Sequence, residues 1–372
     1  MLPADKTIFI SAGDPSGDIA GYHLIKQLKK EYPDINYLGL GGNRMKNAGQ
    51  EQLVDGDQLA VLGFWEVARK YLFFRKLMYS AVETIENARP AAVVLIDYPG
   101  FNLRLAERIK SLGIPIVYYI SPQIWAWGKK RIHAIKRLVD LMLVILPFET
   151  DIYDKAGVEN GFVGHYLMDD IDPDFIKAPY DAESDMILLM PGSRPQEVQR
   201  MLPTLLRTAE ILSKKGKYRF TIAAVEGNID YESYMAGIDT PVEIIRGKTR
   251  ELIAQSRLVI TSSGTATLET GIIGRPMIVI YKTGMLTYLI ARSLVSIENI
   301  ALINISAGER IVPELVQHDA VPDKIAKEAM RFLDNSDLTQ DVIFKLNKTA
   351  DQLGAPGAAK RAVEHMGDVL KC

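Results

Sequence analysis

The feature that most constrains the fold is an alternation of short apolar runs with longer amphipathic segments, which occurs twice along the chain. In the first part, five runs are apolar or β-branched and are bounded by Gly, Pro or Asp: residues 7–12, 37–40, 91–96, 114–120 and 141–146. Helical patterns such as 21–30 and 103–112 stand between them. Apolar runs that alternate with helices predict a parallel sheet that is buried on both faces.

The second part of the chain repeats this organisation. Five further runs have the pattern of buried strands: 186–190, 220–225, 242–245, 258–261 and 277–280. Helical patterns at 196–214 and 266–273 separate them, and the chain after residue 320 is helical throughout. The stretch 169–185 between the two parts is rich in Asp and Pro and has no periodicity, so we place a linker there.

The predicted fold is therefore α/β, with two doubly wound Rossmann-like domains that face a cleft and a helical C-terminal tail. We expect the domains at 1–168 and 186–320 and the helical segment at 321–372. A chain of 372 residues exceeds the size at which a single core usually keeps growing, which also favours two domains. In such domains, ligands bind at the carboxyl ends of the strands.

Composition narrows the class of protein. Hydrophobic residues make up 48% of the chain, and a net charge of −2 gives no electrostatic reason to expect nucleic acid as a partner. The one cysteine, Cys372, can form no intrachain disulfide, which fits a reducing cytoplasm. The sequence shows no signal-peptide pattern and no run near the roughly 20 apolar residues of a spanning helix. Any contact with a membrane is expected at its surface.

The loop after the first predicted strand combines glycines with polar residues. Gly13, Gly17 and Gly21 permit a tight turn and a close approach of the backbone to a ligand. Their spacing differs from that of the dinucleotide-binding fingerprint. The alternative is a simple turn into a helix that Asp14 or Ser16 caps.

Two further strand ends in the first part carry chemically useful residues. Asp97 follows four apolar residues, so partial desolvation is expected to raise its pKa toward that of a general base, although Asp97 or Asn102 could instead cap the next helix. Trp125 and Trp127 lie near the basic residues 129–131. They suit a wall that stacks on sugars and binds phosphate, or they are core aromatics beneath a loop.

In the second part, two strand-to-helix loops suit a diphosphate. The backbone N–H groups of Gly192 and Ser193, together with the guanidinium of Arg194, match the geometry of phosphate. Small residues at 262–266 let a helix start approach a diphosphate, whose charge the helix dipole favours; these include Ser263, Gly264 and Thr265. Glu269 lies about one turn further on, within reach of ribose hydroxyls. A purely structural serine-rich cap is the alternative.

Other motifs fail to support a metal site or a hydrolase. The Asp-x-Asp pairs at 55–57 and 172–174 do not follow strongly apolar strands, and we interpret both as solvated turns. None of the five histidines has the paired helical spacing of a zinc site. Ser262 and Ser263 lack the nucleophile-elbow pattern. We therefore expect neither a metal nor another cofactor.

Taken together, these segments resemble the lipid-A-disaccharide synthase family. The resemblance spans residues 7–317, and its many ordered blocks make it specific: 11–18, 41–45, 96–102, 121–127, 146–149, 164–165, 191–194, 263–269 and 304–317. It implies a GT-B arrangement with an acceptor-binding amino-terminal domain and a UDP-sugar domain after it. The family couples UDP-2,3-diacylglucosamine to 2,3-diacylglucosamine 1-phosphate through a β-1,6 linkage and releases UDP.

The resemblance also implies roles for single residues. The essential aspartate of the family falls on Asp97 and its essential arginine on Arg194, while Glu269 and Asn304 fall in donor-side motifs. Ser16, Trp125 and Trp127 fall on the acceptor side. The chain departs from the family at three positions: Asp14 where Glu is frequent, Tyr166 where Pro is common, and Gly100 where some members have a second Asp. Whether Asp97 or Asp14 is the base stays open.

A basic, aromatic segment at 64–79 predicts contact with an anionic membrane, from which the acylated substrates must be drawn. Wound as a helix, one face carries Val67, Tyr71, Phe74 and Met78. The opposite side then carries Phe73 and Leu77 among the cations Arg69, Lys70 and Lys76. The alternative is that Phe73 and Leu77 cover a neighbouring loop or a dimer partner.

The resemblance further implies a location and a partner. We expect a peripheral protein on the cytoplasmic face of the inner membrane, and a homodimer in which the segment 321–372 is exchanged or packs back on its own amino-terminal domain. The rival interpretations are another UDP-sugar enzyme of GT-B type, such as an epimerase or a peptidoglycan transferase, and an inactive nucleotide-sugar-binding scaffold.

Overall fold

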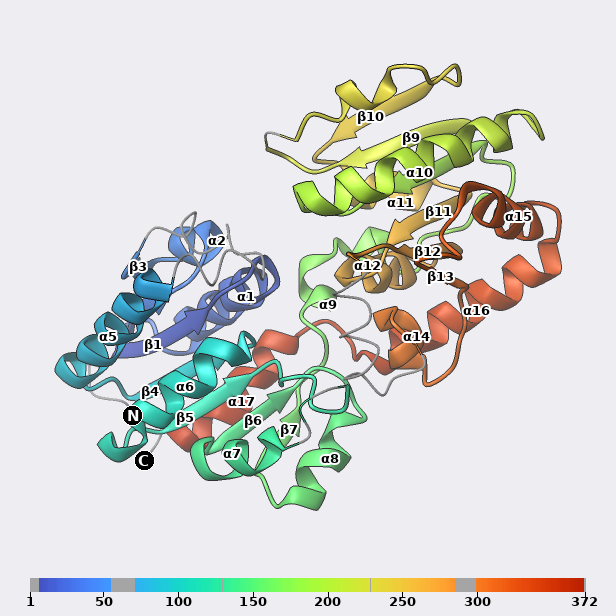
Figure 1. Ribbon diagram of the computed structural model, residues 1–372. Coiled ribbons are helices and arrows are strands. Elements are labelled where there is room, and N and C mark those ends of the chain that lie inside the picture. Colours follow the sequence, from blue (N-terminus) through green and yellow to red (C-terminus); the bar gives the residue numbers. More distant parts are fainter. Residues whose placement is uncertain are drawn as a thin grey trace. The chain divides into compact units, whose positions relative to one another are not determined.

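The computed structural model describes residues 7–54, 71–126, 128, 130–227, 229–284 and 299–370. Contacts within the chain divide these residues into two units. Unit 1 comprises the described residues up to Asp170 together with those from Leu353 onward, and unit 2 comprises those in Ile171–Gln352. Figure 1 shows a sheet with helices on both faces in each unit.

The described part of unit 1 contains a parallel sheet of seven strands in the order β3-β2-β1-β4-β5-β6-β7. The strands are β1 (Thr7–Ala12), β2 (Asn36–Leu40), β3 (Gln50–Gln52), β4 (Ala92–Ile96), β5 (Ile116–Tyr119), β6 (Leu141–Val144) and β7 (Asn160–Phe162). Strand β1 pairs Ile8 with Tyr37 of β2 on one side and with Ala92 of β4 on the other. The five apolar runs predicted as strands in this part are all strands, and the polar β3 and the short β7 extend the edges.

Helices cover both faces of this sheet. They are α1 (Pro15–Glu31), α2 (Asn43–Asn47), α5 (Tyr71–Ala88), α6 (Pro99–Ile109), α7 (Arg131–Leu138), α8 (Glu149–Ala156), α9 (Leu167–Asp170) and α17 (Ala358–Leu370), with a 3₁₀ turn η1 (Lys110–Leu112). Helices α5, α6 and α7 pack side by side on one face, and α1 and α17 pack together on the other (Figure 1). The last helix of the chain is therefore part of unit 1.

The described part of unit 2 contains a parallel sheet of six strands in the order β10-β9-β8-β11-β12-β13. The strands are β8 (Met186–Met190), β9 (Arg219–Ala224), β10 (Val242–Arg246), β11 (Leu258–Ser262), β12 (Met277–Tyr281) and β13 (Glu314–Val316). The five runs predicted as strands here are all strands, and the short β13 is added at one edge.

The helices of unit 2 include the first two helices of the C-terminal tail. They are α10 (Pro195–Ser213), α11 (Thr249–Gln255), α12 (Thr265–Ile273), α14 (Leu302–Ala307), α15 (Pro322–Leu333) and α16 (Ser336–Gln352), with 3₁₀ turns η2 (Pro173–Phe175) and η3 (Glu232–Met235). Helix α15 packs against α10, and α16 packs against α12 (Figure 1). The predicted segment 321–372 is thus divided between the two units.

Local sequence signals explain where the helices next to the strand ends begin and stop. Asp14 caps α1 by accepting a hydrogen bond from the N–H of Gly17, and prolines occupy the first positions of α1, α6 and α10, where no N–H is needed. Helices α8 and α12 end at Gly157 and Gly274, both left-handed. The cap and the prolines thus place the starts of α1, α6 and α10 at the carboxyl ends of β1, β4 and β8.

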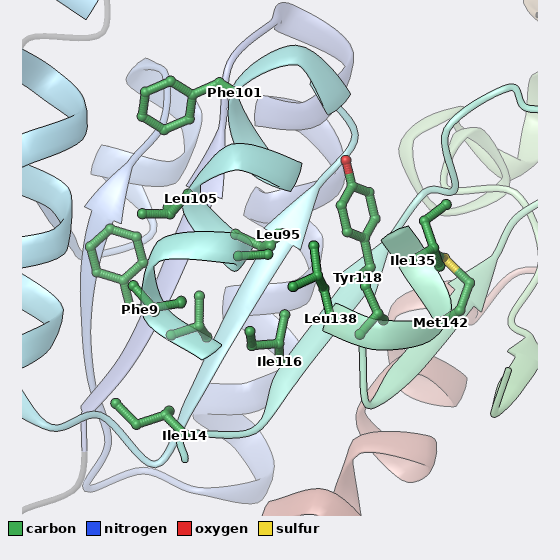
Figure 2. Packing of buried hydrophobic residues seen from close by; sticks show 14 of the residues in the cluster. Phe9, Leu95, Phe101, Leu105, Ile114, Ile116, Tyr118, Ile135, Leu138 and Met142 are labelled. Atoms are coloured by element: carbon green, nitrogen blue, oxygen red, sulfur yellow. The ribbon is translucent and has the colours of Figure 1, made fainter. Parts of the chain in front are cut away.

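One large apolar cluster fills the space between the sheet of unit 1 and helices α5, α6 and α7. Figure 2 shows part of it, with Phe9, Leu95 and Ile116 from the strands against Leu105 and Leu138 from the helices. All five side chains are buried. This packing holds β4 and β5 rigidly, and with them the loops that follow these strands.

The predicted face of the helix at 64–79 needs correction. Leu77, expected to be exposed, is 3% exposed and belongs to the core cluster. The side of α5 that faces the sheet carries Leu77, Ala81 and Ile85 at intervals of four residues. The buried apolar stripe of this helix is therefore wider than the pattern of residues 67–78 predicts. Phe73 is partly buried against the same cluster.

None of the helices in the described residues is both long and apolar enough to cross a bilayer.

Candidate functional site

The strand order of each sheet defines where a ligand is expected. In unit 1 the sheet extends from β1 in both directions, through β2 on one side and through β4 on the other; in unit 2 the corresponding strand is β8, between β9 and β11. Such a reversal is the switch point of a doubly wound fold, and ligands bind there at the carboxyl ends of the strands. The switch points carry the loops after β1 and β4 in unit 1, and the loops after β8 and β11 in unit 2.

Asp97 directly follows β4 at the switch point of unit 1. Its φ is 44° and that of Tyr98 is 47°, so two successive non-glycine residues adopt the left-handed conformation. Each such residue costs on the order of 1–3 kcal/mol and persists only where its surroundings enforce it. The side chain of Asp97 is partly buried. Burial, reinforced by the negative charge of Asp14, raises the pKa of Asp97 to about 7.

The loop after β1 supports this turn at close range. Asp14 accepts a hydrogen bond from the N–H of Gly17 at 2.7 Å. A Cβ on Gly13 would overlap the ring of Tyr98, so glycine is required where these two loops cross. Ser16 lies in the first turn of α1 and is partly buried. The structure thus brings Asp14, Ser16 and Asp97 to one end of the sheet.

Asp18 explains why the first loop and the segment 41–45 occur together. Its carboxylate accepts hydrogen bonds from the N–H groups of Gly42 and Met45, each at 2.9 Å, and of Arg44 at 3.1 Å. These amides open helix α2. The role of Asp18 is therefore structural, since it fixes the loop after β2 against α1.

A buried carboxylate that the sequence interpretation missed lies at the start of α8. Glu149 accepts hydrogen bonds from Ser121 Oγ at 2.5 Å, from Trp125 Nε1 at 3.1 Å and from the N–H of Leu146 at 3.2 Å. Burial raises the pKa of Glu149 to about 7, although these three hydrogen bonds act to lower it. Glu149 therefore fixes the loop after β5, whose Trp125 is half-buried and makes an edge contact with Phe148. Trp127 lies outside the described residues.

At the switch point of unit 2, the carboxylate of Glu197 accepts hydrogen bonds from backbone N–H groups of the loop after β8. Glu197 Oε2 accepts the N–H groups of Ser193 at 3.0 Å and Arg194 at 3.3 Å, and its Oε1 accepts a hydrogen bond from Arg194 Nη1 at 3.0 Å. Gly192 has a φ of 115°, and a Cβ at this position would overlap the side chain of Glu197. Of the amides expected to bind a diphosphate, that of Ser193 is thus engaged by Glu197, while the side chain of Arg194 is 70% exposed.

The neighbouring loop, after β11, leads directly into helix α12. Gly264 has a φ of 141° and a ψ of −161°, a conformation open essentially only to glycine. Thr265 begins α12, and the N-cap residue Gly264 has no side chain that could cap the helix. Ser263 Oγ donates to the carbonyl of Ile300 at 2.9 Å. The positive end of the helix dipole therefore lies at the carboxyl end of β11.

Glu269 and Asn304 both have hydrogen-bond partners within the chain. Glu269 Oε1 accepts hydrogen bonds from Arg250 Nε at 3.1 Å and Nη2 at 2.9 Å. The buried Asn304 donates to the carbonyl of Val312 and to Glu314, and it accepts the N–H groups of Ile311 and Val312. All four hydrogen-bonding positions of this amide are filled, so Asn304 supports the segment beside Ser263 instead of reaching a ligand.

The exposed side of α5 differs from the one predicted. Leu72 is 68% exposed and Tyr79 is 51% exposed, and they lie seven residues apart on one face. The guanidinium carbons of Arg75 and Arg108 lie 5.7 and 5.2 Å from the centre of the Tyr79 ring. Lys76 is exposed beside them, whereas Arg69 and Lys70 lie outside the described residues. We call Leu72, Arg75, Lys76, Tyr79 and Arg108 the α5 patch.

The described ranges contain no group of three or more His, Cys, Asp or Glu side chains that could hold a metal ion.

Comparisons with known sequences all identify the same family. The sequence model of the lipid-A-disaccharide synthetase family matches residues 8–363. The lipid-A-disaccharide synthase of Syntrophus aciditrophicus is 41% identical over 367 residues, which cover 96% of each chain. That of Nitrosococcus oceani is 39% identical and covers 96% of this chain and 94% of its own.

Solved structures agree on the fold. A putative UDP-N-acetylglucosamine 2-epimerase from Listeria monocytogenes matches with a TM-score of 0.65 at 15% identity, covering 96% of this chain and 94% of its own. A calicheamicin glycosyltransferase matches with a TM-score of 0.63 at 14% identity, covering 97% and 98%. The two doubly wound units thus follow the GT-B pattern, and at this identity the likeness concerns the fold alone.

Proposed function

The chain belongs to the lipid-A-disaccharide synthetase family, and from this premise we propose its substrates and mechanism. The family makes the chain a UDP-sugar-dependent glycosyltransferase of lipid A biosynthesis. We propose that it transfers 2,3-diacylglucosamine from its UDP derivative to the 6-hydroxyl of 2,3-diacylglucosamine 1-phosphate. The products are the β-1,6-linked disaccharide 1-phosphate and UDP.

The observation that carries this proposal is the position and the raised pKa of Asp97. A general base works best when its pKa lies near the working pH, and burial together with Asp14 raises that of Asp97 to about 7. The strained turn places it at the carboxyl end of β4, where doubly wound units bind ligands. No acid stands at Gly100 to share its role. Unit 1 is therefore proposed to bind the acceptor, with Ser16, Trp125 and Trp127 on the acceptor side.

Unit 2 is proposed to hold the UDP portion of the donor. The start of α12 at Gly264 and Thr265 offers N–H groups and a favourable dipole to a diphosphate. A bound diphosphate would compete with Glu197 for the guanidinium of Arg194, which is mostly exposed. Glu269, held by Arg250, is proposed to meet the ribose. Asn304 contributes by supporting this helix start.

The reaction is proposed to be a single displacement with inversion. Asp97 takes the proton of the acceptor 6-hydroxyl as that oxygen forms a bond to the anomeric carbon, and the bond from this carbon to the diphosphate breaks. Arg194 and the α12 start stabilise the charge that develops on the departing UDP. The mechanism assigns no step to a metal or another cofactor, so we expect activity to persist in excess EDTA; abolition by EDTA with rescue by magnesium would contradict it.

We further propose that the protein docks on an anionic membrane at the cytoplasmic face of the inner membrane. The α5 patch combines exposed Leu72 and Tyr79 with three cations. Apolar side chains insert among lipids while cations meet phosphates, which suits an enzyme with acylated substrates. A homodimer is proposed as well, from the family resemblance.

One assay tests the proposed reaction. UDP release is measured with the acylated donor, in the presence of 2,3-diacylglucosamine 1-phosphate or of glucosamine 1-phosphate without acyl chains. We expect release that depends on the acylated acceptor and yields a disaccharide. Conversion of a UDP-sugar to its epimer would identify an epimerase, and nucleotide-sugar binding without turnover would identify a scaffold. Either result would overturn the proposal.

A further inference from the structure

The turn at Asp97 and Tyr98 needs an explanation for its stability. Both residues have a positive φ, and neither is glycine. A backbone in this state relaxes toward ordinary conformations unless neighbouring groups prevent it. The groups that hold this turn therefore determine where the carboxyl group of Asp97 lies.

Both peptide groups that flank the Cα of Asp97 are fixed. Its N–H donates to the carbonyl of Tyr119 at 3.0 Å, which continues the pairing of β4 with β5. Its carbonyl accepts hydrogen bonds from Tyr118 Oη at 2.6 Å and from Asn102 Nδ2 at 2.9 Å. The shorter of these two bonds comes from the neighbouring strand.

The two donors differ in what else they do. Asn102 also donates to the carbonyls of Ile96 and Ser11 and accepts a hydrogen bond from Ser11 Oγ at 2.7 Å, so it joins β1 to β4. Tyr118 stands in the apolar cluster, and Figure 2 shows its hydroxyl at the outer end of the side chain, away from Leu138. Among the residues that the structure describes, the carbonyl of Asp97 is the hydrogen-bond partner of this hydroxyl.

We infer that Tyr118 is a positioning residue that holds the carboxyl group of Asp97 in its reactive place by fixing the carbonyl of the strained turn. Without the Tyr118 hydroxyl, Asn102 still satisfies this carbonyl, so the fold persists while the turn gains freedom. A displacement of about 1 Å at a reacting group costs about a hundredfold in rate. This role rests on the proposed function of Asp97 as the base.

The test compares two neighbouring tyrosines. Tyr118→Phe removes one oxygen, and Tyr119→Phe removes the equivalent oxygen from a buried side chain on the opposite face of β5. We expect kcat of Tyr118→Phe to fall about tenfold to a hundredfold, with KM for donor and acceptor within about twofold of native. We expect kcat of Tyr119→Phe to stay native, and both variants to unfold near the native temperature.

A kcat within about twofold of native in Tyr118→Phe would overturn the inference, as would equal losses in the two variants. The double variant Asp97→Asn with Tyr118→Phe shows whether Tyr118 acts through Asp97. We expect it to be no slower than Asp97→Asn alone, because the group being positioned is gone. A further loss in the double variant would mean that Tyr118 acts elsewhere.

The same set separates this inference from the proposed function. If Asp97→Asn keeps near-native activity, the base assignment fails and the positioning role fails with it. If Asp97→Asn is inactive but Tyr118→Phe is native, the base assignment stands and only the positioning role is overturned.

Discussion

At the switch point of unit 1, the loops carry the carboxylates of Asp14 and Asp97, whereas at that of unit 2 the loop after β8 carries the guanidinium of Arg194. The strand orders are equivalent: each sheet reverses at its first strand, β1 or β8. In unit 1, Asp14 and Asp97 lie close enough for one to raise the pKa of the other. In unit 2, Arg194 and α12 present positive charge and helix dipole. Topology therefore sets where a ligand binds, and the loops set which charge is favoured there.

The two units also differ in how their proposed reactive groups, Asp97 and Arg194, are held. The Asp97 carbonyl is fixed by side chains from β5 and α6, and the side chain of Asp97 is partly buried. Arg194 belongs to a mostly exposed loop in which Glu197 occupies the amides. A base must be placed accurately against a hydroxyl, while a cation can stabilise a diphosphate over a wider range of positions.

The largest effect is expected for Asp97→Asn. Loss of the base should lower kcat by about two to four orders of magnitude. The fold should persist, because a neutral amide avoids the burial cost that raises the pKa of this carboxyl group. The measurement is kcat with both substrates saturating, together with the affinity for UDP. Asp151→Asn, at an exposed position of α8, is the matched control. A loss of UDP affinity in Asp97→Asn would break the division of roles between the units.

A smaller loss is expected for Arg194→Ala. Removing a cation that stabilises the leaving diphosphate should lower kcat by roughly two to three orders of magnitude and weaken UDP binding. Acceptor binding should stay native. Calorimetric titration with UDP and steady-state rates measure both effects, and Arg200→Ala, at an exposed position of the helix α10 that follows Arg194, is the control. Unchanged UDP affinity and turnover would show that the clamp lies elsewhere.

Much of the fold was predictable because buried parallel strands are continuous apolar runs. All ten such runs form strands, and the strands that were missed are three-residue segments at sheet edges: β3, β7 and β13. An edge strand has one neighbour and needs little apolar surface, and β3 has the sequence Gln-Glu-Gln. Leu77 was misplaced because the phase of the helix was set on Val67, Tyr71, Phe74 and Met78 instead of on Ala81 and Ile85.

The geometry of the candidate site was predictable where its residues lie at strand ends, and less so where they are held by contacts that are distant in the sequence. Asp97, Arg194 and Gly264 all follow strands, which the sequence indicates. Glu149 was missed because its partner Ser121 lies 28 residues away. Glu197 had a local signal, since an acidic residue three positions after the start of a helix often accepts amides there. The filled hydrogen bonds of Asn304 appear only in three dimensions.

Asp14→Asn tests whether the negative charge of Asp14 shapes the pH dependence of the activity. Asp97 must be ionised to act, so activity should be lost as pH falls below about 7, the raised pKa of Asp97. Asn keeps the cap of α1 but removes the negative charge, which lowers the pKa of Asp97 and moves this loss of activity to lower pH. Burial, the larger cause, persists. The measurement is the pH profile of kcat/KM. Complete inactivity of Asp14→Asn at every pH would indicate that Asp14 is the base.

The smallest effect is expected for substitutions in the α5 patch. The test compares an exposed apolar residue of unit 1 with one of unit 2. Leu72 on α5 and Phe344 on α16 are both 68% exposed, but only Leu72 lies among the cations of the patch. Insertion of one apolar side chain stabilises membrane binding by about 1.5–3 kcal/mol when burial is complete, and a helix on the bilayer surface buries it in part.

Leu72→Ser with Tyr79→Ser is therefore expected to reduce sedimentation with anionic vesicles about tenfold, and higher salt should weaken binding further because it screens Arg75, Lys76 and Arg108. Phe344→Ser should leave vesicle binding native. Turnover of substrates dispersed in detergent should be unchanged in all variants, because none of these residues lies at a switch point. If the double variant binds vesicles as the native protein does, or if Phe344→Ser releases the protein instead, the α5 patch is not the docking surface.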